Sequence, residues 1–298
     1  MIQRRTFLAG VAAISAKASW GAQTAGNVLP IKRAVEFEML PTALSIADRM
    51  QLARDSGFEQ IECPTTPDPA KAAEMKRGAE KAGLRIHSVM NMDHWKYPLS
   101  SADASVVERS LKGARTSIEN AHFWGADSVL IVPGVVDASN SYSDVYKRSR
   151  ESINKLLPLA EQYRIIIGLE EVWNKFLLSP LEFATYVDGF HSDFLRAYFD
   201  VGNVVLYGYP QDWILTLGKR IVKLHIKDFS FRVDPVSHDR VAKWMPLLEG
   251  DIDWHAVHDA LREIGYVGSA SVELPGGDGE YLKEVNRRFE RILSGDVG

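Results

Sequence analysis

The feature that most constrains the fold is a recurring pattern: a helical stretch, then a glycine, then a short run of β-forming residues. It recurs in LARDSGFEQIEC, EKAGLRIHSVMN, NAHFWGADSVLIVPG and LREIGYVGSASVEL. The glycines stand where a helix end needs a left-handed residue before the chain turns into a strand, and they are Gly57, Gly83, Gly125 and Gly265. The pattern therefore predicts helices and strands that alternate along the chain.

This pattern gives four strands, and the runs AVEFEM, RIIIGLE, LRAYFDV and IVKLHI give four more. We expect them at Ala34–Met39, Gln60–Cys63, Arg85–Met90, Ser128–Val132, Ile165–Glu170, Leu195–Val201, Ile221–Ile226 and Ala270–Leu274. Most segments between them have helical periodicity, and no low-complexity linker interrupts them. Eight alternations predict a single α/β domain, a (β/α)8 TIM barrel over residues 27–298. The alternative, an open doubly wound sheet, needs a glycine-rich turn after its first strand, whereas EFEMLPTALS contains no glycine.

Residues 1–22 resemble a twin-arginine export signal. The stretch RRTFL precedes an apolar run that is too short to span a bilayer, and small residues follow it. We expect cleavage after Ala18 or Ala22, passage through the twin-arginine export machinery, a periplasmic mature protein and no stable membrane anchor. A soluble N-terminal helix or a membrane anchor stays the alternative.

The charge balance and the cysteine content exclude several classes of function. A formal net charge of −4 at pH 7, without a basic run, gives no footprint for nucleic acid or for an anionic membrane. Cys63 is the single cysteine, which rules out an intrachain disulfide and a cysteine cluster for zinc.

The stretch IVKLHIKDF, Ile221 to Phe229, shows what the predicted strands carry. By the two-residue period of a strand, Leu224 and Ile226 share the apolar face, and His225 stands on the opposite one. The same rule leaves one polar side chain opposite the apolar face at the end of each of the last four strands. These side chains are Glu170, Asp200, His225 and Glu273. Strand-end positions of this parity face the active site of a barrel, so we expect the four to converge.

Two glutamates, one aspartate and one histidine form an oxygen-rich set with a single nitrogen. Such a set suits one divalent ion, Mn²⁺ first, with Mg²⁺, Co²⁺ or Zn²⁺ as alternatives. Each residue taken alone has a plain alternative as an ion pair or a satisfied buried polar group. Four of them at matching strand ends favour a metal site.

The chain resembles the xylose-isomerase-like TIM-barrel family of sugar phosphate isomerases and epimerases, from about Ile31 to Phe289. The motifs that carry the resemblance are HWKYPLSS, GLEEVWNKFLLSP, YFDVGNVVLYGYPQDW, KLHIKDF and EGDIDWHAVHDALREIGYVGSASVELPGG. The family also contains inosose dehydratases and type IV endonucleases. The resemblance implies a divalent metal held by the four residues at the ends of the late strands.

Two details of the resemblance stay open. In some relatives the spacing from the metal glutamate to the following asparagine, here Asn174, is shorter by one residue, so Glu171 is the alternative ligand; strand parity favours Glu170. Some ketose 3-epimerases have a substrate-contacting histidine three residues after the aspartate, where this chain has Asn203. That departure puts their exact substrate in doubt.

The expected chemistry is proton transfer beside a carbonyl. A metal chelated by a substrate carbonyl and its neighbouring hydroxyl acidifies the C–H between them by stabilising the enediolate. Two carboxylates on opposite sides of the sugar, Glu170 and Glu273, then serve as the catalytic base and acid. Their double role as metal ligands is implied by the resemblance. The first expectation is therefore a metal-dependent isomerase or epimerase of a ketose or related sugar.

Other functions compete with this expectation. A lyase or dehydratase would use the same enediolate on a keto-sugar, keto-glycoside or inosose with a leaving group β to the carbonyl. A non-catalytic sugar-binding barrel would have lost its glutamates, and both are present here. An endonuclease on abasic DNA is excluded because the chain lacks a basic excess and the many histidines of a multi-metal site. A homo-oligomer is suggested by analogy alone.

Seven further residues are candidates for contact with the sugar: Glu62, His94, Trp95, Asn174, Asn203, Lys227 and Arg232. For Glu62 a structural ion pair is the alternative, and for Lys227 an ion pair with the ligand carboxylates. Trp95 can stack on a sugar face or pack on the rim. Arg232 belongs to SFRVDPVSHDRVAKWMPLLEGD, which we expect to form an extended loop, either a lid over the mouth or a solvated segment. The substrate is expected to be unphosphorylated, although the glycines of LPGGDG can cradle a phosphate or form a turn.

Overall fold

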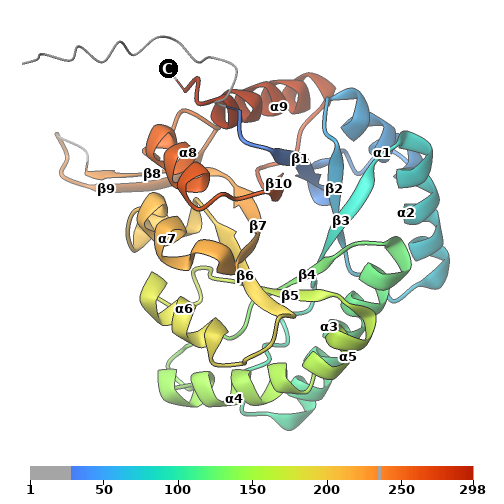
Figure 1. Ribbon diagram of the computed structural model, residues 1–298, viewed down its shortest axis with the longest axis vertical. Helices are drawn as coiled ribbons and strands as arrows, with labels where there is room; N and C mark the ends of the chain where they lie inside the picture. The colour runs from blue at the N-terminus through green and yellow to red at the C-terminus, as the bar shows by residue number, and fades with distance from the viewer. Residues whose placement is uncertain (1–27, 234–235, 298) are drawn as a thin grey trace, which may run out of the picture.

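The structure, a computed structural model, describes residues 28–233 and 236–297. Parallel strands close into a barrel in the order β1-β10-β7-β6-β5-β4-β3-β2, and helices surround it (Figure 1). The predicted (β/α)8 barrel is therefore confirmed, and the open doubly wound sheet is wrong. The predicted export signal, residues 1–22, lies outside the described residues.

The elements alternate as the glycine pattern predicts. The barrel strands are β1 (Ile31–Glu36), β2 (Gln60–Pro64), β3 (Arg85–Met90), β4 (Ser128–Ile131), β5 (Ile166–Glu170), β6 (Leu195–Asp200), β7 (Ile221–Ile226) and β10 (Gly268–Val272). The helices are α1 (Ile46–Asp55), α2 (Pro69–Ala82), α3 (Ala104–Trp124), α4 (Tyr142–Asn154), α5 (Leu157–Tyr163), α6 (Pro180–Asp188), α7 (Pro210–Leu217), α8 (Trp254–Glu263) and α9 (Gly279–Ser294). Short 3₁₀ turns are η1 (Phe37–Met39), η2 (Asn203–Leu206) and η3 (Gly218–Arg220).

The glycines at the helix ends adopt the left-handed conformation that the pattern requires. The φ angles of Gly57, Gly83, Gly125 and Gly265 are +94°, +68°, +74° and +65°. A side chain other than glycine is strained at such angles, so each glycine ends its helix and turns the chain toward the next strand.

The first and last barrel strands begin earlier than the apolar pattern predicted. The predicted first strand, Ala34–Met39, is wrong by three residues, since β1 ends at Glu36 and η1 follows. Phe37 and Met39 are buried there because this turn packs on the segment after β10, where the Gly277 N–H donates to the Met39 carbonyl (3.2 Å). The apolar pattern thus continued past the end of the strand. Likewise β10 ends at Val272, which leaves Glu273 directly beyond it.

The segment predicted as an extended loop after the seventh strand is a β-hairpin instead. Strands β8 (Asp228–Val233) and β9 (Arg240–Met245) pair antiparallel and project from the barrel beside α8 (Figure 1). Asp228 anchors this hairpin, because its carboxylate accepts hydrogen bonds from the Phe229 N–H (2.9 Å), the Gly250 N–H (3.1 Å) and the Trp254 indole (3.0 Å). The hairpin and the start of α8 are therefore tied to one buried carboxylate.

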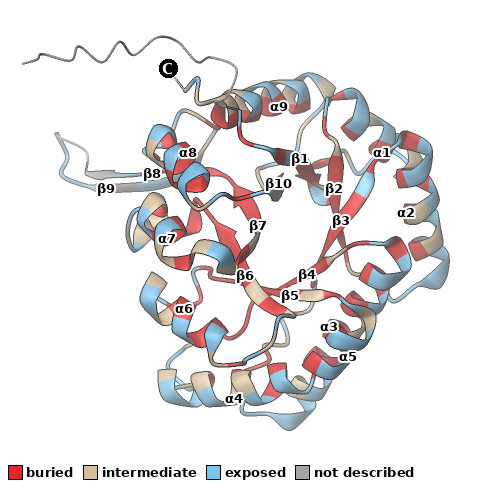
Figure 2. Cartoon of the chain, in the orientation of Figure 1, coloured by how far each residue is buried: buried red, intermediate tan, exposed pale blue. Residues whose placement is uncertain are grey.

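The apolar core lies between the barrel and the ring of helices. Figure 2 shows buried residues along the strands and on the inner faces of the helices, with exposed residues outside. The interior of the barrel is polar at the level of Tyr198, His225 and Glu62, which contact one another across it. Within the described residues, no helix combines the length and the apolar character needed to cross a bilayer.

We predict that Asp228→Ala lowers the free energy of unfolding by about 3 kcal/mol, because it leaves buried donors unsatisfied. Asp239→Ala is the control, since Asp239 is exposed in the turn of the hairpin, and it should change the value by less than about 0.5 kcal/mol. Urea denaturation measures both. Equal midpoints for the two variants would contradict the anchoring role of Asp228.

Candidate metal centre

Four side chains at the carboxyl ends of the late strands converge. Glu170 ends β5, Asp200 ends β6, His225 is the penultimate residue of β7, and Glu273 follows β10. One ligand atom from each lies within 4.8 Å of the others. The structure thus brings together the four residues predicted to hold a metal.

The imidazole of His225 lies at the centre of this cluster. Its Nδ1 is 2.9 Å from Glu170 Oε1, 2.9 Å from Glu273 Oε2 and 3.7 Å from Asp200 Oδ2. Donors that share one divalent ion stand roughly 3–4.5 Å apart, because each lies about 2.0–2.3 Å from the ion. Three carboxylates and one imidazole nitrogen at this spacing fit a divalent ion such as Mn²⁺ or Mg²⁺.

The side chains of Glu170 and Glu171 lie in different surroundings. Glu171 is almost fully buried, and its carboxylate accepts a hydrogen bond from the Asp200 N–H (3.1 Å). Burial, followed by repulsion from Asp200, raises the pKa of Glu171 well above its usual range. The converging set contains Glu170, so the geometry agrees with the choice made from strand parity, and Glu171 supports the backbone of Asp200.

Lys227 places its ammonium among the same carboxylates. Its Nζ is 2.7 Å from Asp200 Oδ2 and 2.6 Å from Glu273 Oε2, and it lies 5.0 Å from the centre of the Trp244 ring. Burial alone would lower the pKa of Lys227, but the attraction of Asp200 and Glu273 outweighs it and raises that pKa. Lys227 is therefore a fixed positive charge, and the ion pair considered as its alternative role is present.

The two glutamates of the cluster are shifted in opposite directions. Burial raises the pKa of Glu170 to about 7, although His225 opposes this shift. Burial also acts to raise the pKa of Glu273, but Lys227 and His225 outweigh it and lower that pKa below its usual range. Two carboxyl groups whose environments push their pKa values apart are suited to opposite roles in proton transfer.

Glu62 lies behind His225 instead of facing the mouth. The residue is fully buried, its Oε2 is 2.8 Å from His225 Nε2, and it accepts a hydrogen bond from the Tyr198 hydroxyl (2.9 Å). The predicted contact of Glu62 with a sugar does not fit this placement, because His225 stands between it and the cluster. A carboxylate on the remote nitrogen of a ligand histidine fixes the tautomer and raises the basicity of the ring.

His94 and Trp95 differ in burial. His94 is 4% exposed, and its Nδ1 accepts a long hydrogen bond from the Val132 N–H (3.5 Å). Burial lowers the pKa of His94 to about 4, against a weaker attraction from Glu273, so the ring is neutral at pH 7. Trp95 is 56% exposed and meets His94 edge to face. Trp95 therefore keeps a ring surface free for an apolar sugar face.

Asn174 and Asn203 direct their amides to the backbone. The Asn174 amide donates to the Gly134 carbonyl (2.6 Å), and the Asn203 amide donates to the Glu171 carbonyl (3.1 Å). The Asn203 N–H also donates to Asp200 Oδ1 (2.8 Å). In this arrangement both asparagines stabilise loops around the cluster, and Asn203 orients the Asp200 carboxylate.

Arg232 lies in β8, but its side chain is not among those that the structure describes. Its predicted contact with a sugar therefore stays a prediction.

Glu36 is a residue of the mouth that the sequence reasoning missed. It ends β1, and burial followed by repulsion from Glu273 raises its pKa to about 8. The error in the first strand explains the omission, because a strand from Ala34 to Met39 places Glu36 in its middle and not at its end. Parity alone would have found it once the end of the strand was known.

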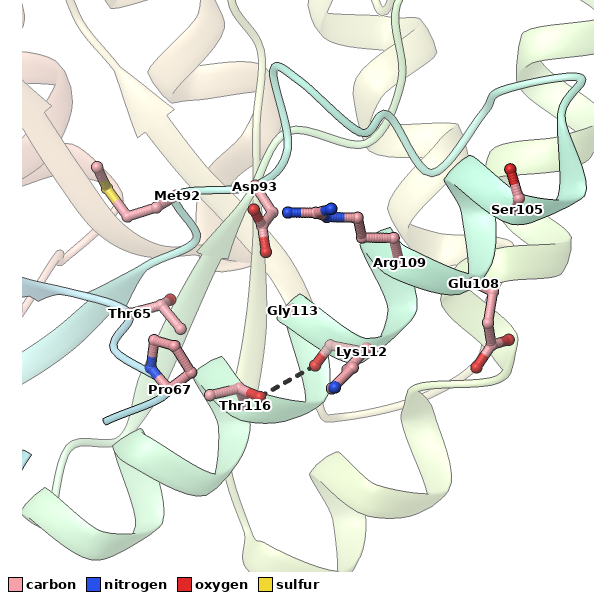
Figure 3. Close-up of a pocket in the computed structure, with 10 residues that line it drawn as sticks. All are labelled: Thr65, Pro67, Met92, Asp93, Ser105, Glu108, Arg109, Lys112, Gly113 and Thr116. Atoms are coloured by element: carbon pink, nitrogen blue, oxygen red, sulfur yellow. Dashed lines mark hydrogen bonds between the residues drawn. The ribbon is translucent and has the colours of Figure 1, made fainter. Parts of the chain in front are cut away.

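A separate cavity of about 580 Å³ lies between the loops after β2 and β3 and helix α3 (Figure 3). The Asp93 carboxyl and the Arg109 guanidinium point toward each other in it, and Met92 and Pro67 add apolar surface (Figure 3). None of the predicted site residues lines this cavity.

Comparisons with known proteins agree with the fold. The family model described as "Xylose isomerase-like TIM barrel" matches residues 50–291. L-ribulose-5-phosphate 3-epimerase UlaE of Escherichia coli O1:K1 / APEC is 23% identical over 246 residues, which span 79% of this chain and 84% of that protein.

Solved structures share the architecture at low identity. A D-tagatose 3-epimerase-like protein is similar with a TM-score of 0.74 at 22% identity, over 90% of this chain and 100% of that one. A xylose isomerase-like TIM-barrel protein from Mycobacterium smegmatis, in complex with magnesium, has a TM-score of 0.70 at 19% identity, over 91% of this chain and 98% of that one. These likenesses extend over the whole barrel.

We predict that Glu62→Gln raises the dissociation constant for Mn²⁺ by about 10- to 100-fold, because His225 loses the carboxylate that orients it. Isothermal titration calorimetry on chelator-treated protein measures the constant. Tyr198→Phe is the matched control, since it removes the other hydrogen bond of Glu62 and leaves the His225 contact in place; a smaller change is expected. Wild-type affinity in Glu62→Gln would contradict the role of this carboxylate.

Proposed function

The chain belongs to the xylose isomerase-like TIM-barrel family, and we propose that it is a sugar isomerase or epimerase that depends on one divalent ion, Mn²⁺ first. The observation that carries this proposal is the convergence of Glu170, Asp200, His225 and Glu273 within 4.8 Å. Relatives and structural neighbours named as sugar 3-epimerases add support.

The proposed reaction moves a proton on the carbon beside the sugar carbonyl. Glu170, Asp200, His225 and Glu273 would hold a divalent ion, which would supply a Lewis acid for the negative charge that develops on the sugar oxygens. Glu273, which Lys227 and His225 keep ionised, removes the proton on one side of the sugar. Glu170, carrying a proton at that stage, returns it on the other side, and the roles exchange in the reverse reaction.

In this proposal Lys227 is also a hydrogen-bond donor to the substrate. Its ammonium touches both Asp200 and Glu273 and rests on the Trp244 ring. From this position it can donate a hydrogen bond to a substrate oxygen as negative charge develops there. The ring limits where the ammonium can move, so the donor stays directed at the cluster.

We propose an unphosphorylated sugar as the substrate. In many barrels a phosphate binds near the loop after the eighth strand and a helix start. Here the corresponding helix, α9, is already capped by the Asp278 carboxylate, which accepts from the Tyr281 N–H (3.0 Å), and Glu280 adds negative charge to its first turn. Both acids repel a phosphate, which separates this chain from a relative named for a sugar phosphate.

The test is deuterium exchange in D₂O by the Mn²⁺-loaded protein with a panel of free and phosphorylated ketoses and keto-sugars. Proton NMR follows the C–H beside the carbonyl. We expect deuterium there together with a new epimer or aldose, and faster exchange with the free sugar than with its phosphate. Exchange coupled to loss of a leaving group would replace the isomerase with a lyase. Absence of exchange with every sugar by a metal-loaded protein would refute both.

We predict that Glu273→Gln lowers the turnover number by about 10²- to 10⁴-fold, because it removes a proton carrier and an ion ligand. Glu263→Gln on the exposed side of α8 is the control and should keep wild-type turnover. Near-normal activity of Glu273→Gln would overturn the assignment.

We further propose that the protein is exported to the periplasm by the twin-arginine route, from the resemblance of residues 1–22 to such a signal. A reporter fused after Ala22 should reach the periplasm, and replacement of Arg4 and Arg5 by lysine should stop it, because that route requires the arginine pair. Cell fractionation measures the distribution. Retention of the native fusion in the cytoplasm would refute export.

A further inference from the structure

Glu36 lies between the carboxylates of Glu62 and Glu273. The parallel register pairs Glu36 with Glu62 of β2 on one side. On the other side Val35 pairs with Val272 of β10, so the next residues along these strands, Glu36 and Glu273, continue side by side at the mouth. The turn that follows Glu36 is fastened to the segment after Glu273, since Met39 accepts a hydrogen bond from the Gly277 N–H (3.2 Å). The backbone thus holds Glu36 beside the cluster.

The two carboxylates beside Glu36 have hydrogen-bond or ion-pair partners, whereas the Glu36 carboxyl has none among the described residues. Glu62 contacts His225 and Tyr198, and Glu273 contacts His225 and Lys227. Among the contacts of the described residues, no hydrogen bond or ion pair involves the Glu36 carboxyl. It is only partly buried, so a molecule in the mouth can reach it. Glu36 also lies outside the set of four donors that share one point.

A carboxyl group placed among like charges without a partner is costly unless something else satisfies it. The oxygens of a carboxyl group can accept hydrogen bonds. Sugar hydroxyls can donate them, and a sugar bound at the cluster would lie beside the end of β1. A partner from the substrate would satisfy Glu36 without competing with the metal donors.

We propose that Glu36 is a further substrate-contacting residue, which holds one hydroxyl of the sugar at the mouth between β1 and β10. This proposal rests on the proposed function, because it takes a sugar as the ligand of the same site. Its consequence differs from that of the metal assignment. Loss of Glu36 should weaken the binding of the sugar and leave the affinity for the ion unchanged.

The test measures two affinities in Glu36→Ala and Glu36→Gln. Calorimetry first determines the dissociation constant of Mn²⁺, and then that of a polyol that cannot react, such as the reduced form of the best-bound ketose, on the Mn²⁺-loaded protein. Ketose turnover gives KM and kcat separately. Glu38→Gln is the matched control, because Glu38 is exposed in the adjacent turn and lies 3.9 Å from Arg49.

We expect the Mn²⁺ constant to stay within about twofold of wild type in both variants, because Glu36 is not among the donors. The dissociation constant of the polyol and KM should rise by about 10- to 100-fold in Glu36→Ala, and by less in Glu36→Gln, whose amide oxygen still accepts a hydrogen bond. The control should match wild type.

Unchanged polyol affinity in Glu36→Ala would overturn the proposal. A loss of Mn²⁺ affinity in this variant would also overturn it, because Glu36 would then be an ion ligand or a residue that supports Glu273. Polyol binding by a wild-type protein that turns over no sugar would refute the proposed reaction alone, with Glu36 still judged by the polyol. A wild-type protein that binds no sugar or polyol would refute both.

Discussion

The mouth of this barrel holds more negative charge than its own cations can balance. Among the described residues, His225 and Lys227 contact four carboxyl groups, and the carboxyl groups of Glu36 and Glu171 lie near these. The four in contact are Glu62, Glu170, Asp200 and Glu273. Burying carboxylates without compensation costs far more than the marginal stability of a domain, so such groups take up protons or bind a cation. The raised pKa values of Glu36, Glu170 and Glu171 reflect the first route. A divalent ion at the four donors would be the second.

The His225 ring links the carboxylates of the mouth to the polar side chains inside the barrel. One ring nitrogen faces the carboxylates of the mouth, and the other contacts Glu62, which also accepts from Tyr198 on β6. Farther along the interior, His87 Nε2 lies 2.9 Å from the Ser271 hydroxyl. These contacts cross the barrel between strands that are not neighbours in the sheet, and those of Glu170 and Glu62 hold the two nitrogens of the His225 ring from different strands. Rigid donors of this kind lose little entropy when an ion or a substrate binds.

The architecture and the four donors were predictable because both follow from periodicity. A two-residue period decides which side chains point inward, and a glycine with positive φ decides where a helix stops, so neither needs knowledge of distant contacts. Glu62 and Glu36 show what periodicity cannot decide. Parity placed Glu62 on the inner face, but its depth relative to His225 depends on the register between strands. Glu36 was missed because Phe37 and Met39 continue an apolar pattern after the strand has ended, and only the contact with the segment after β10 shows why. The hairpin was read as a loop because its apolar residues belong to its own small sheet and not to the barrel.

The motif HIKD shows how one short stretch joins fold and site. His225 and Lys227 share the inward parity, so the first supplies a nitrogen donor and the second an ammonium to the same cluster. Asp228 is the next residue and turns away to hold the hairpin and α8. The hairpin then returns Trp244 to the site, where its ring lies 5.0 Å from the Lys227 ammonium and stacks on Trp173 of the loop after β5. A change at Asp228 would therefore reach Lys227 through the hairpin and Trp244, although Asp228 contacts none of the four donors. In this barrel an element outside the repeating βα pattern thus supplies one of the contacts around the Lys227 ammonium, beside those of Asp200 and Glu273.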